Sequence, residues 1–247
     1  MNKHEFAVYV SHVSPKEKRI HLQDTDVVHR IRSVLRLEVG DGLMLFDGQH
    51  HYDCRITEIN KKSISLSILS TEQSAQLSPS ITVLLPLLKR EAFERMLYAC
   101  VELGANAVQP IVTEKSQRSW RNEHEFERAR AIMIAAAEQS KQYAIPEIHA
   151  PCTLQEAIEG VAGNSIKLVA DPAGDSLYKV LTDVKQHVQA GKGSIVMTMG
   201  PEGDFTDAEK NILKTASYQS VCLTPTVLRS AQAGALLLGV IRSIISE

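Results

Sequence analysis

The chain has 247 residues, enough for one large domain or two modest ones, and 44% of them are hydrophobic, which is enough to bury a core. Charged residues make up 23%, close to the globular average, which argues against a disordered or fibrous chain. The net charge of −2 gives no sign by itself of a nucleic-acid partner.

The cysteines and histidines show no metal-ligand spacing. The four cysteines are far apart and form no CxxC pair, which argues against a disulfide framework or a zinc site. Reduced thiols in a cytoplasmic protein are therefore expected. The His50-His51 pair and the run Glu123–Glu125 lack convincing metal spacing as well, so no metal is expected.

No segment of the sequence predicts a membrane partner. Residues Met1–Val10 contain no apolar signal core. The longest nearly pure apolar stretch, Ala233–Ile241, is too short to cross a bilayer. A soluble protein of the cytoplasm is the expectation.

The first 70 residues have the two-residue hydrophobic period of β-strands. The run Leu43–Phe46 leads into Asp47-Gly48, a dipeptide typical of hairpin turns. Apolar and polar residues then alternate in two further segments, 52–56 and 64–68. One short helix is expected over 26–35. Together these patterns predict a small antiparallel sheet or barrel.

A polar segment, Ser70–Ser80, predicts a linker, and beyond it strands alternate with helices. Domains are accordingly expected at 1–72 and 79–247. The expected strands of the second domain are 81–85, 107–112, 166–170, 194–199 and 221–223. The expected helices are 91–103, 123–142, one that begins at the capping box Thr206–Glu209, and 231–245. This order predicts an α/β fold with a mostly parallel sheet and helices on both faces.

Ligands of such sheets bind in the loops beyond the C-terminal ends of the strands. Three loops qualify: Asp171–Asp175, Gly200–Phe205 and Thr224–Ser230. The second contains two glycines, which let a backbone approach a ligand closely, and a proline that stiffens the turn. The third carries Arg229, whose guanidinium can bind phosphate or stabilise a developing anion. A plain strand-to-helix turn and a structural ion pair are the alternatives.

A second basic feature lies in the first domain, where three arginines follow His29 at positions 30, 32 and 36. Such a cluster is either a solvated helix face or a contact for phosphates. Dinucleotide, P-loop and hydrolase motifs are all missing from the sequence.

The order and spacing of several short motifs resemble the ribosomal RNA small subunit methyltransferase E family, part of the SPOUT superfamily of knotted methyltransferases. The resemblance covers nearly the full length of the chain. It rests on His29–Arg36, Gly40-Asp41, Phe46–Gly48, Lys89, Glu102–Gly104, Pro110, Ala136–Ser140, Ile145–Ile148, Gly200–Gly203, Glu209 and Val227–Arg229.

This resemblance implies an N-terminal PUA-like β-barrel that helps bind RNA and a C-terminal SPOUT α/β domain tied in a trefoil knot. It implies S-adenosylmethionine as cofactor, held by the knot loops, and a homodimer with the site near the subunit interface. The implied reaction is methylation of N3 of a uridine in 16S ribosomal RNA of the small ribosomal subunit.

The resemblance also suggests which residues carry the reaction. Arg229 is expected to stabilise the charge that develops on the uridine ring, with Glu202 or Glu138 as candidate proton acceptors. The RNA contacts expected are Arg30, Arg32, Arg36 and Lys89. The cofactor contacts expected are Met199, Gly200, Pro201, Glu202, Gly203, Leu223, Thr224 and Leu228.

The chain departs from the family pattern at several of these positions. Asp204 replaces a glycine, although aspartate tolerates the left-handed backbone better than most residues do. An acidic residue and a threonine are replaced at Ala231 and Gln232, and a lysine is absent near Ala99. A glycine and an arginine are replaced by Thr224 and Thr226, and an arginine by Gln142.

These departures leave three functions open. The chain is an active uridine-N3 methyltransferase, a divergent SPOUT enzyme that acts on another RNA, or an RNA-binding or ribosome-assembly protein that keeps the fold without methyl transfer. The missing acidic residue near Ala231 favours the last two, whereas the Gly-Pro-Glu-Gly and Leu-Arg motifs favour the first.

Overall fold

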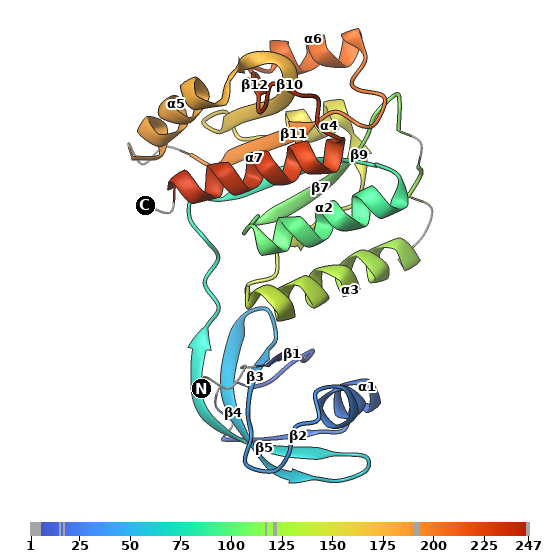
Figure 1. Cartoon of the computed structure of the whole chain (residues 1–247), viewed down its shortest axis with the longest axis vertical. Coiled ribbons are helices and arrows are strands. Elements are labelled where there is room, and N and C mark those ends of the chain that lie inside the picture. The colour runs from blue at the N-terminus through green and yellow to red at the C-terminus, as the bar shows by residue number, and fades with distance from the viewer. Residues whose placement is uncertain are drawn as a thin grey trace. The chain divides into compact units, whose positions relative to one another are not determined.

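The computed structural model describes residues 6–14, 16, 18–116, 118–120, 123–189 and 193–245. The chain forms two compact units (Figure 1). The first comprises residues 1–75 together with 137–145, and the second comprises 76–136 together with 146–247. Within the described ranges, no helix combines the length and the apolar character that a membrane span requires.

The first unit is built on a five-stranded sheet with the order β1-β3-β4-β5-β2. Its pairs are antiparallel except for β1 with β3, which is parallel. The strands are β1 (Ala7–Tyr9), β2 (Arg19–Leu22), β3 (Gly42–Phe46), β4 (His50–Ile59) and β5 (Ile64–Gln73). This arrangement confirms the predicted small sheet and the hairpin at Asp47-Gly48.

The core of the first unit lies on the faces that the alternating pattern predicted. Tyr52, Cys54 and Ile56 of β4 are fully buried, and the hydroxyl of Tyr52 donates to the carbonyl of Val13 at 2.8 Å. The predicted short helix is present as α1 (Thr25–His29) followed by one π-helical turn, η1 (Arg30–Val34). Asp24 caps α1 by accepting two backbone N–H groups.

The predicted linker begins later than expected. β5 continues to Gln73 because residues 70–73 pair with His50–Asp53 of β4. Backbone pairing therefore extends the strand through residues whose polar side chains predicted a linker, since ladder hydrogen bonds do not require apolar side chains. The connecting segment is thus limited to 74–80.

The second unit contains a seven-stranded sheet in which every described pair is parallel. Its main order is β12-β10-β11-β6-β7-β8, and β9 also pairs with β7. The strands are β6 (Ile81–Pro86), β7 (Ala107–Val112), β8 (Glu147–Ile148), β9 (Cys152–Thr153), β10 (Ile166–Ser176), β11 (Ile195–Met199) and β12 (Gln219–Cys222).

Helices cover both faces of this sheet, as the alternating pattern predicted. In Figure 1, α2 and α7 lie side by side in front of the sheet, whereas α4 and α6 pack with the strands through a core that includes Leu84, Val196 and Phe205. The helices are α2 (Arg90–Glu102), α3 (Glu123–Ser140), α4 (Leu154–Glu159), α5 (Leu177–Gln189), α6 (Asp207–Thr215) and α7 (Ser230–Ile245).

Two predicted helix ends are confirmed in detail. Gly104 follows α2 with φ of +74°, the left-handed conformation that glycine adopts without strain. Thr206 and Glu209 form the predicted capping box of α6, in which each side chain accepts the other residue's backbone N–H.

Several features of the second unit, among them the two-residue strands β8 and β9, differ from the prediction. The pairing of β10 with β12 jumps from Ala170 to Asp175, so the predicted turn at 171–174 is a bulge within a longer strand. The helices α4 and α5 were not predicted. α4 has only 6 residues, fewer than two turns, which is too short for a clear helical period.

Residues 137–145 belong with the first unit, although the boundaries expected from the sequence place them in the second domain. The backbone N–H of Tyr9 donates to Glu138 Oε1 at 2.9 Å, and the ring of Tyr143 lies 5.2 Å from that of Phe46. These contacts join segments that are far apart in sequence, which no local pattern reveals. The expected boundaries, like the trefoil knot, stay predictions.

Candidate active site

A cavity of about 830 Å³ opens in the second unit at the C-terminal ends of three adjacent strands, β10, β11 and β12. All three loops predicted from the sequence line it, through Ala170–Pro172, Met199–Glu202 with Asp204, and residues 223–224 with 226–230. Helix α2 forms another wall. The volume lies in the range of sites for small molecules and cofactors.

The loop after β11 makes a turn that requires glycine at its first position. A Cβ atom on Gly200 would lie 2.6 Å from Asp204 Oδ1 and 3.3 Å from Asp204 Cα. Asp204 adopts φ of +59°, and its backbone N–H donates to the carbonyl of Pro201 at 2.9 Å. Aspartate therefore accommodates the left-handed backbone here, as expected from the sequence.

The carboxylate of Asp204 fixes the far side of the same turn. Its Oδ1 accepts the N–H of Phe205 at 2.8 Å, and its Oδ2 lies 2.6 Å from Lys210 Nζ. The hydrogen bond that Lys210 donates to Asp204 raises the pKa of Lys210, against a smaller opposing effect of burial. The turn is thus tied to α6.

Neighbouring elements hold the remainder of the loop. Glu202 Oε1 accepts the backbone N–H of Lys89 at 2.9 Å, which ties the loop to the start of α2. Lys115 Nζ donates to the carbonyl of Gly203 at 2.9 Å. The loop therefore presents a fixed backbone to the cavity, a property that favours binding of a ligand without reorganisation.

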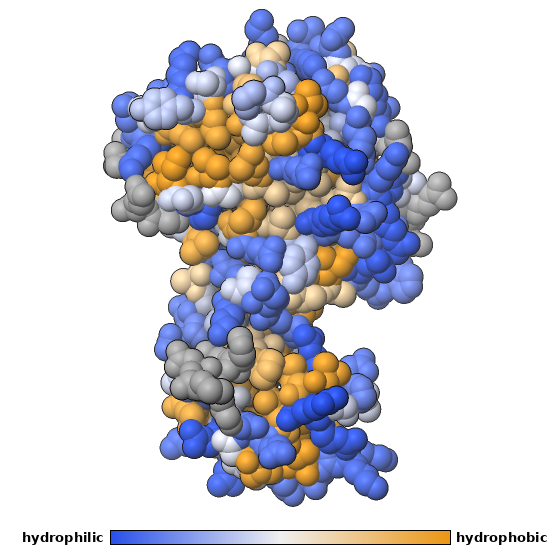
Figure 2. All heavy atoms as spheres, in the orientation of Figure 1, coloured by the Kyte–Doolittle hydropathy of each residue, from blue (hydrophilic) through white to orange (hydrophobic). Residues whose placement is uncertain are grey.

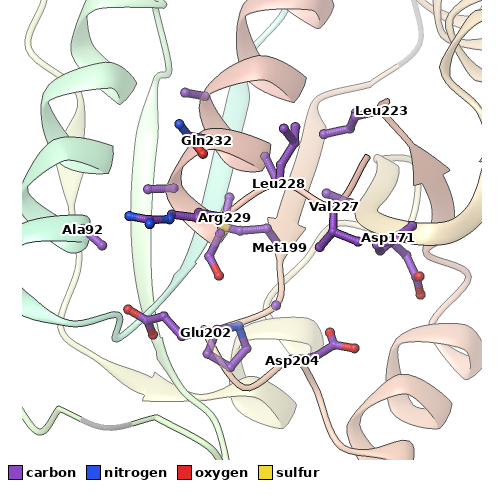
Figure 3. Close-up of a pocket in the computed structure, with 18 of the residues that line it drawn as sticks. Ala92, Asp171, Met199, Glu202, Asp204, Leu223, Val227, Leu228, Arg229 and Gln232 are labelled. Atoms are coloured by element: carbon purple, nitrogen blue, oxygen red, sulfur yellow. The ribbon is translucent and has the colours of Figure 1, made fainter. Parts of the chain in front are cut away.

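Arg229 lies between β12 and α7 and is exposed within the cavity. Figure 3 shows its guanidinium extended toward α2, where Ala92 is labelled, on the side of the cavity that also holds Glu202. Among the described residues, none forms a hydrogen bond or ion pair with its side chain. A cation placed in this way can bind an anionic group of a ligand.

Close packing of α7 against the sheet sets the position of Arg229. A Cβ on Gly234 would lie 2.3 Å from Met199 Cε and 3.0 Å from Met96 Cε, so two methionine side chains fill the space beside this glycine and would have to move for a larger residue. The sequence signal for this role is an isolated glycine inside an apolar helix, which often has a packing reason.

Most of the predicted cofactor contacts come together in this cavity. Met199, Gly200, Pro201, Glu202, Leu223, Thr224 and Leu228 line it, whereas Gly203 does not, and Lys89 also lines it. Of the wall formed by α2, the sequence pointed to Ala99 alone, as a departure from the family pattern, and Glu91, Ala92 and Arg95 were missed. No motif marks these residues, which reach the cavity because α2 follows a neighbouring strand of the sheet.

The other predicted site residues lie in the first unit and do not line the cavity. Arg30 Nη2 lies 2.5 Å from Oε2 of the buried Glu138. Burial raises the pKa of Glu138, and the Tyr9 N–H and the Arg30 charge offset this only in part. Arg32 donates to the carbonyl of Lys61 at 3.2 Å, and Arg36 is exposed with φ of +54°.

Comparisons with known proteins agree with this geometry. The RNA methyltransferase domain family matches residues 75–242, and the RNA methyltransferase PUA domain family matches residues 22–69. A ribosomal RNA small subunit methyltransferase E from Synechocystis is 30% identical over 225 residues, which cover 90% of this chain and 73% of that protein. One from Rickettsia conorii is 25% identical over 95% of this chain and 94% of its own length.

A solved structure extends the likeness to three dimensions. The crystal structure of a ribosomal RNA small subunit methyltransferase E from Neisseria gonorrhoeae, bound to S-adenosyl methionine, superposes with a TM-score of 0.83 at 25% identity. The match covers 97% of this chain and 98% of that one. With its PUA domain, its parallel α/β domain and these matches, the chain belongs to the ribosomal RNA small subunit methyltransferase E family.

Proposed function

We propose that this protein is a cytoplasmic methyltransferase that uses S-adenosylmethionine to methylate N3 of a uridine in 16S ribosomal RNA of the small ribosomal subunit. The observation that carries the proposal is the cavity between the Gly200–Asp204 turn and Arg229, in a chain of this family. The relative from Neisseria gonorrhoeae binds S-adenosyl methionine, and the relatives from Synechocystis and Rickettsia conorii are named for the ribosomal RNA of the small subunit.

The residues around the cavity fit this cofactor. Met199, Leu223 and Leu228 offer apolar contacts, and Gly200, whose missing side chain lets Asp204 close the turn, lines the cavity with them. When bound, S-adenosylmethionine supplies a methyl group on a positively charged sulfur. Methyl transfer by in-line attack needs little covalent help, so positioning by these fixed loops supports much of the rate.

Arg229 supplies the charge that the reaction needs. The N3 atom of uridine loses a proton as it gains a methyl group, and negative charge spreads to the ring oxygens. A guanidinium that no described residue engages is available to stabilise that charge or to hold the phosphate beside it. This role follows from the placement of Arg229 in the cavity.

Glu202 is the better placed of the two candidate proton acceptors, because it lines the cavity and Glu138 does not. The Lys89 N–H binds its Oε1, which leaves Oε2 to accept the proton from N3. We assign Glu138 a different role, in which its ion pair with Arg30 holds that arginine for contact with RNA.

RNA contacts are proposed for Arg30, Arg32, Arg36 and Lys89. The Glu138 carboxylate and the Lys61 carbonyl restrain the first two side chains and so reduce the entropy lost on binding. A uridine in folded RNA must be unpaired or turned out of its stack before its N3 can enter a cavity.

A homodimer is part of this proposal, and an apolar face on α7 supports it. A groove of about 380 Å³ lies along Leu103, Leu236, Gly239, Val240 and Ile244. Figure 2 shows hydrophobic residues gathered over this part of the second unit. A second copy seated there would adjoin the cavity, because Ala235 lines both. Exposed apolar patches of this kind commonly mark protein interfaces.

Transfer of a labelled methyl group tests the proposal directly. Purified protein incubated with methyl-labelled S-adenosylmethionine and 16S ribosomal RNA, free or in small subunits, should label the RNA. S-adenosylmethionine should also raise the melting temperature, as ligand linkage requires. RNA binding without label or thermal shift would instead favour the assembly-protein function, and label in another RNA would favour a divergent enzyme.

A further inference from the structure

Arginines from two helices donate hydrogen bonds to one glutamate in the second unit. Glu94 of α2 accepts from Nε of Arg90, also on α2, at 3.0 Å. It accepts two hydrogen bonds from Arg128 of α3, from Nε at 2.5 Å and from Nη2 at 3.0 Å. These hydrogen bonds, with Arg128 the strongest contributor, lower the pKa of Glu94. We call Arg90, Glu94 and Arg128 the Glu94 cluster.

The cluster presents an excess of positive charge to solvent. The side chains of Arg90 and Arg128 are 65% and 48% exposed, whereas that of Glu94 is 23% exposed. One carboxylate thus neutralises one of two guanidinium charges. Each guanidinium keeps N–H groups that bind no described residue, because only Nε of Arg90 and Nε and Nη2 of Arg128 are engaged.

The helix that carries the cluster also forms a wall of the cavity. Lys89, Ala92 and Arg95 line the cavity, while Arg90 and Glu94 lie on the adjacent side of the same helix, toward α3. Figure 2 shows hydrophilic side chains among apolar ones over the part of the second unit where Figure 1 draws α2 and α3. The cations of the cavity mouth and of the cluster thus lie along α2 and the facing side of α3, with the exposed carboxylates of Glu91 and Glu127 near them.

We propose that the Glu94 cluster is a phosphate-binding surface for the RNA strand that flanks the target nucleotide. The inference rests on the proposed function in one respect, that RNA is the substrate. Guanidinium groups bind phosphate oxygens through paired N–H donors, and the shared carboxylate keeps two of them in fixed positions. The cluster itself is polar and carries one more positive than negative charge, which suits a polyanion better than an apolar partner.

Charge-neutral variants of the full-length protein test the surface. The double variant Arg90→Gln with Arg128→Gln removes two positive charges, and Lys179→Gln with Lys214→Gln removes two from α5 and α6 as a matched control. Affinity for in vitro transcribed 16S ribosomal RNA is measured by filter binding at several salt concentrations. Each phosphate contact on a single strand contributes about 0.7 to the slope of log affinity against log salt, so the cluster variant should lose about 1.4.

Glu94→Gln tests whether the arginine charges or the folded structure of the cluster matter. It removes the carboxylate that both arginines bind and keeps both arginines. In this variant, affinity for the RNA should fall with salt at least as steeply as in the wild type. Equal slopes in the cluster variant and the wild type would overturn the surface, as would an equal loss in the lysine control or in Glu94→Gln. Methyl transfer by the wild type is scored separately. A wild type that binds RNA through the cluster but transfers no methyl group would overturn the proposed function and leave the surface standing.

Discussion

Single residues at the turn after β11 decide how the cavity is shaped. Asp204 takes a left-handed backbone that most residues avoid, and it compensates with hydrogen bonds to Phe205 and Lys210. Gly200 lies opposite Asp204, and a Cβ atom on it would come within 2.6 Å of the Asp204 carboxylate. The site therefore depends on a glycine and an aspartate acting together.

Replacement of Gly200 by alanine is expected to abolish cofactor binding. The new Cβ would lie 2.6 Å from Asp204 Oδ1 and 3.3 Å from Asp204 Cα, so the turn must shift. The rise in melting temperature with S-adenosylmethionine should disappear. Gly163→Ala is the matched control, because nothing lies within 4 Å of its added Cβ. An unchanged thermal shift in Gly200→Ala would contradict the role given to this turn.

Glu202 has an anchoring role and a proposed chemical role that one substitution separates. Glutamine keeps an oxygen that can accept the Lys89 N–H but cannot take a proton. Glu202→Gln should therefore keep the thermal shift with S-adenosylmethionine and lose about 100-fold or more in methyl-transfer rate. Glu202→Ala should lose both. A Glu202→Gln enzyme of wild-type rate would show that Glu202 serves only as an anchor.

The buried carboxyl of Glu138 predicts a pH dependence of stability. Burial raises its pKa above the ordinary value of 4.5, so the folded state binds this proton more tightly than the unfolded chain does. The associated stabilisation is complete below that ordinary value and is lost as pH rises through the raised pKa. Urea unfolding between about pH 4 and pH 7 should show wild type losing stability relative to Glu138→Gln. A constant or rising difference would contradict this assignment.

At the scale of elements, the sequence predicted most strands and helices of the second unit because their hydrophobic periods are strong. The strand 107–112 was predicted with its observed bounds, and α2 and α7 within one residue. Two other differences depended on pairing between distant segments: β5 of the first unit extends along β4, and β10 bulges against β12. Such pairing leaves no local signal.

The C-terminal end of α7 is joined to its surroundings by a buried arginine. Arg242 donates to the carbonyls of Pro79 and Gly104 at 3.0 and 2.6 Å and to Asn106 Oδ1 at 3.0 Å, and burial lowers its pKa. Asn106 Oδ1 also accepts the N–H of Ile81, at the start of β6. The arginine thus links α7 to the connecting segment and to the end of α2.

Arg242→Ala is expected to cost about 3 kcal/mol of unfolding free energy, because it leaves buried acceptors without donors. Urea denaturation of the variant and wild type measures this cost. Arg242→Lys should recover part of it, since lysine can still donate to one or two of these acceptors. A loss below about 0.5 kcal/mol, typical of exposed surface positions, would contradict the linking role.

For the whole molecule, the sequence predicted the loops of the site better than its walls. Gly200–Glu202 and Leu228–Arg229 could be located from strand order alone, whereas the α2 wall depends on which helix packs beside those loops. The departures from the family pattern at Ala99, Thr224, Thr226, Ala231 and Gln232 all line the same cavity. Thr224 Oγ1 donates to the Thr226 carbonyl at 2.7 Å, so a local hydrogen bond now stabilises that loop.

The most direct test of the central claim is mass-spectrometric nucleoside analysis of small-subunit ribosomal RNA from cells with and without this protein. The proposed function predicts that N3-methyluridine disappears without the protein and returns with wild type but not with Arg229→Ala. Because Arg229 is exposed and engages no described residue, that variant should fold normally. Unchanged N3-methyluridine in cells without the protein would contradict the claim.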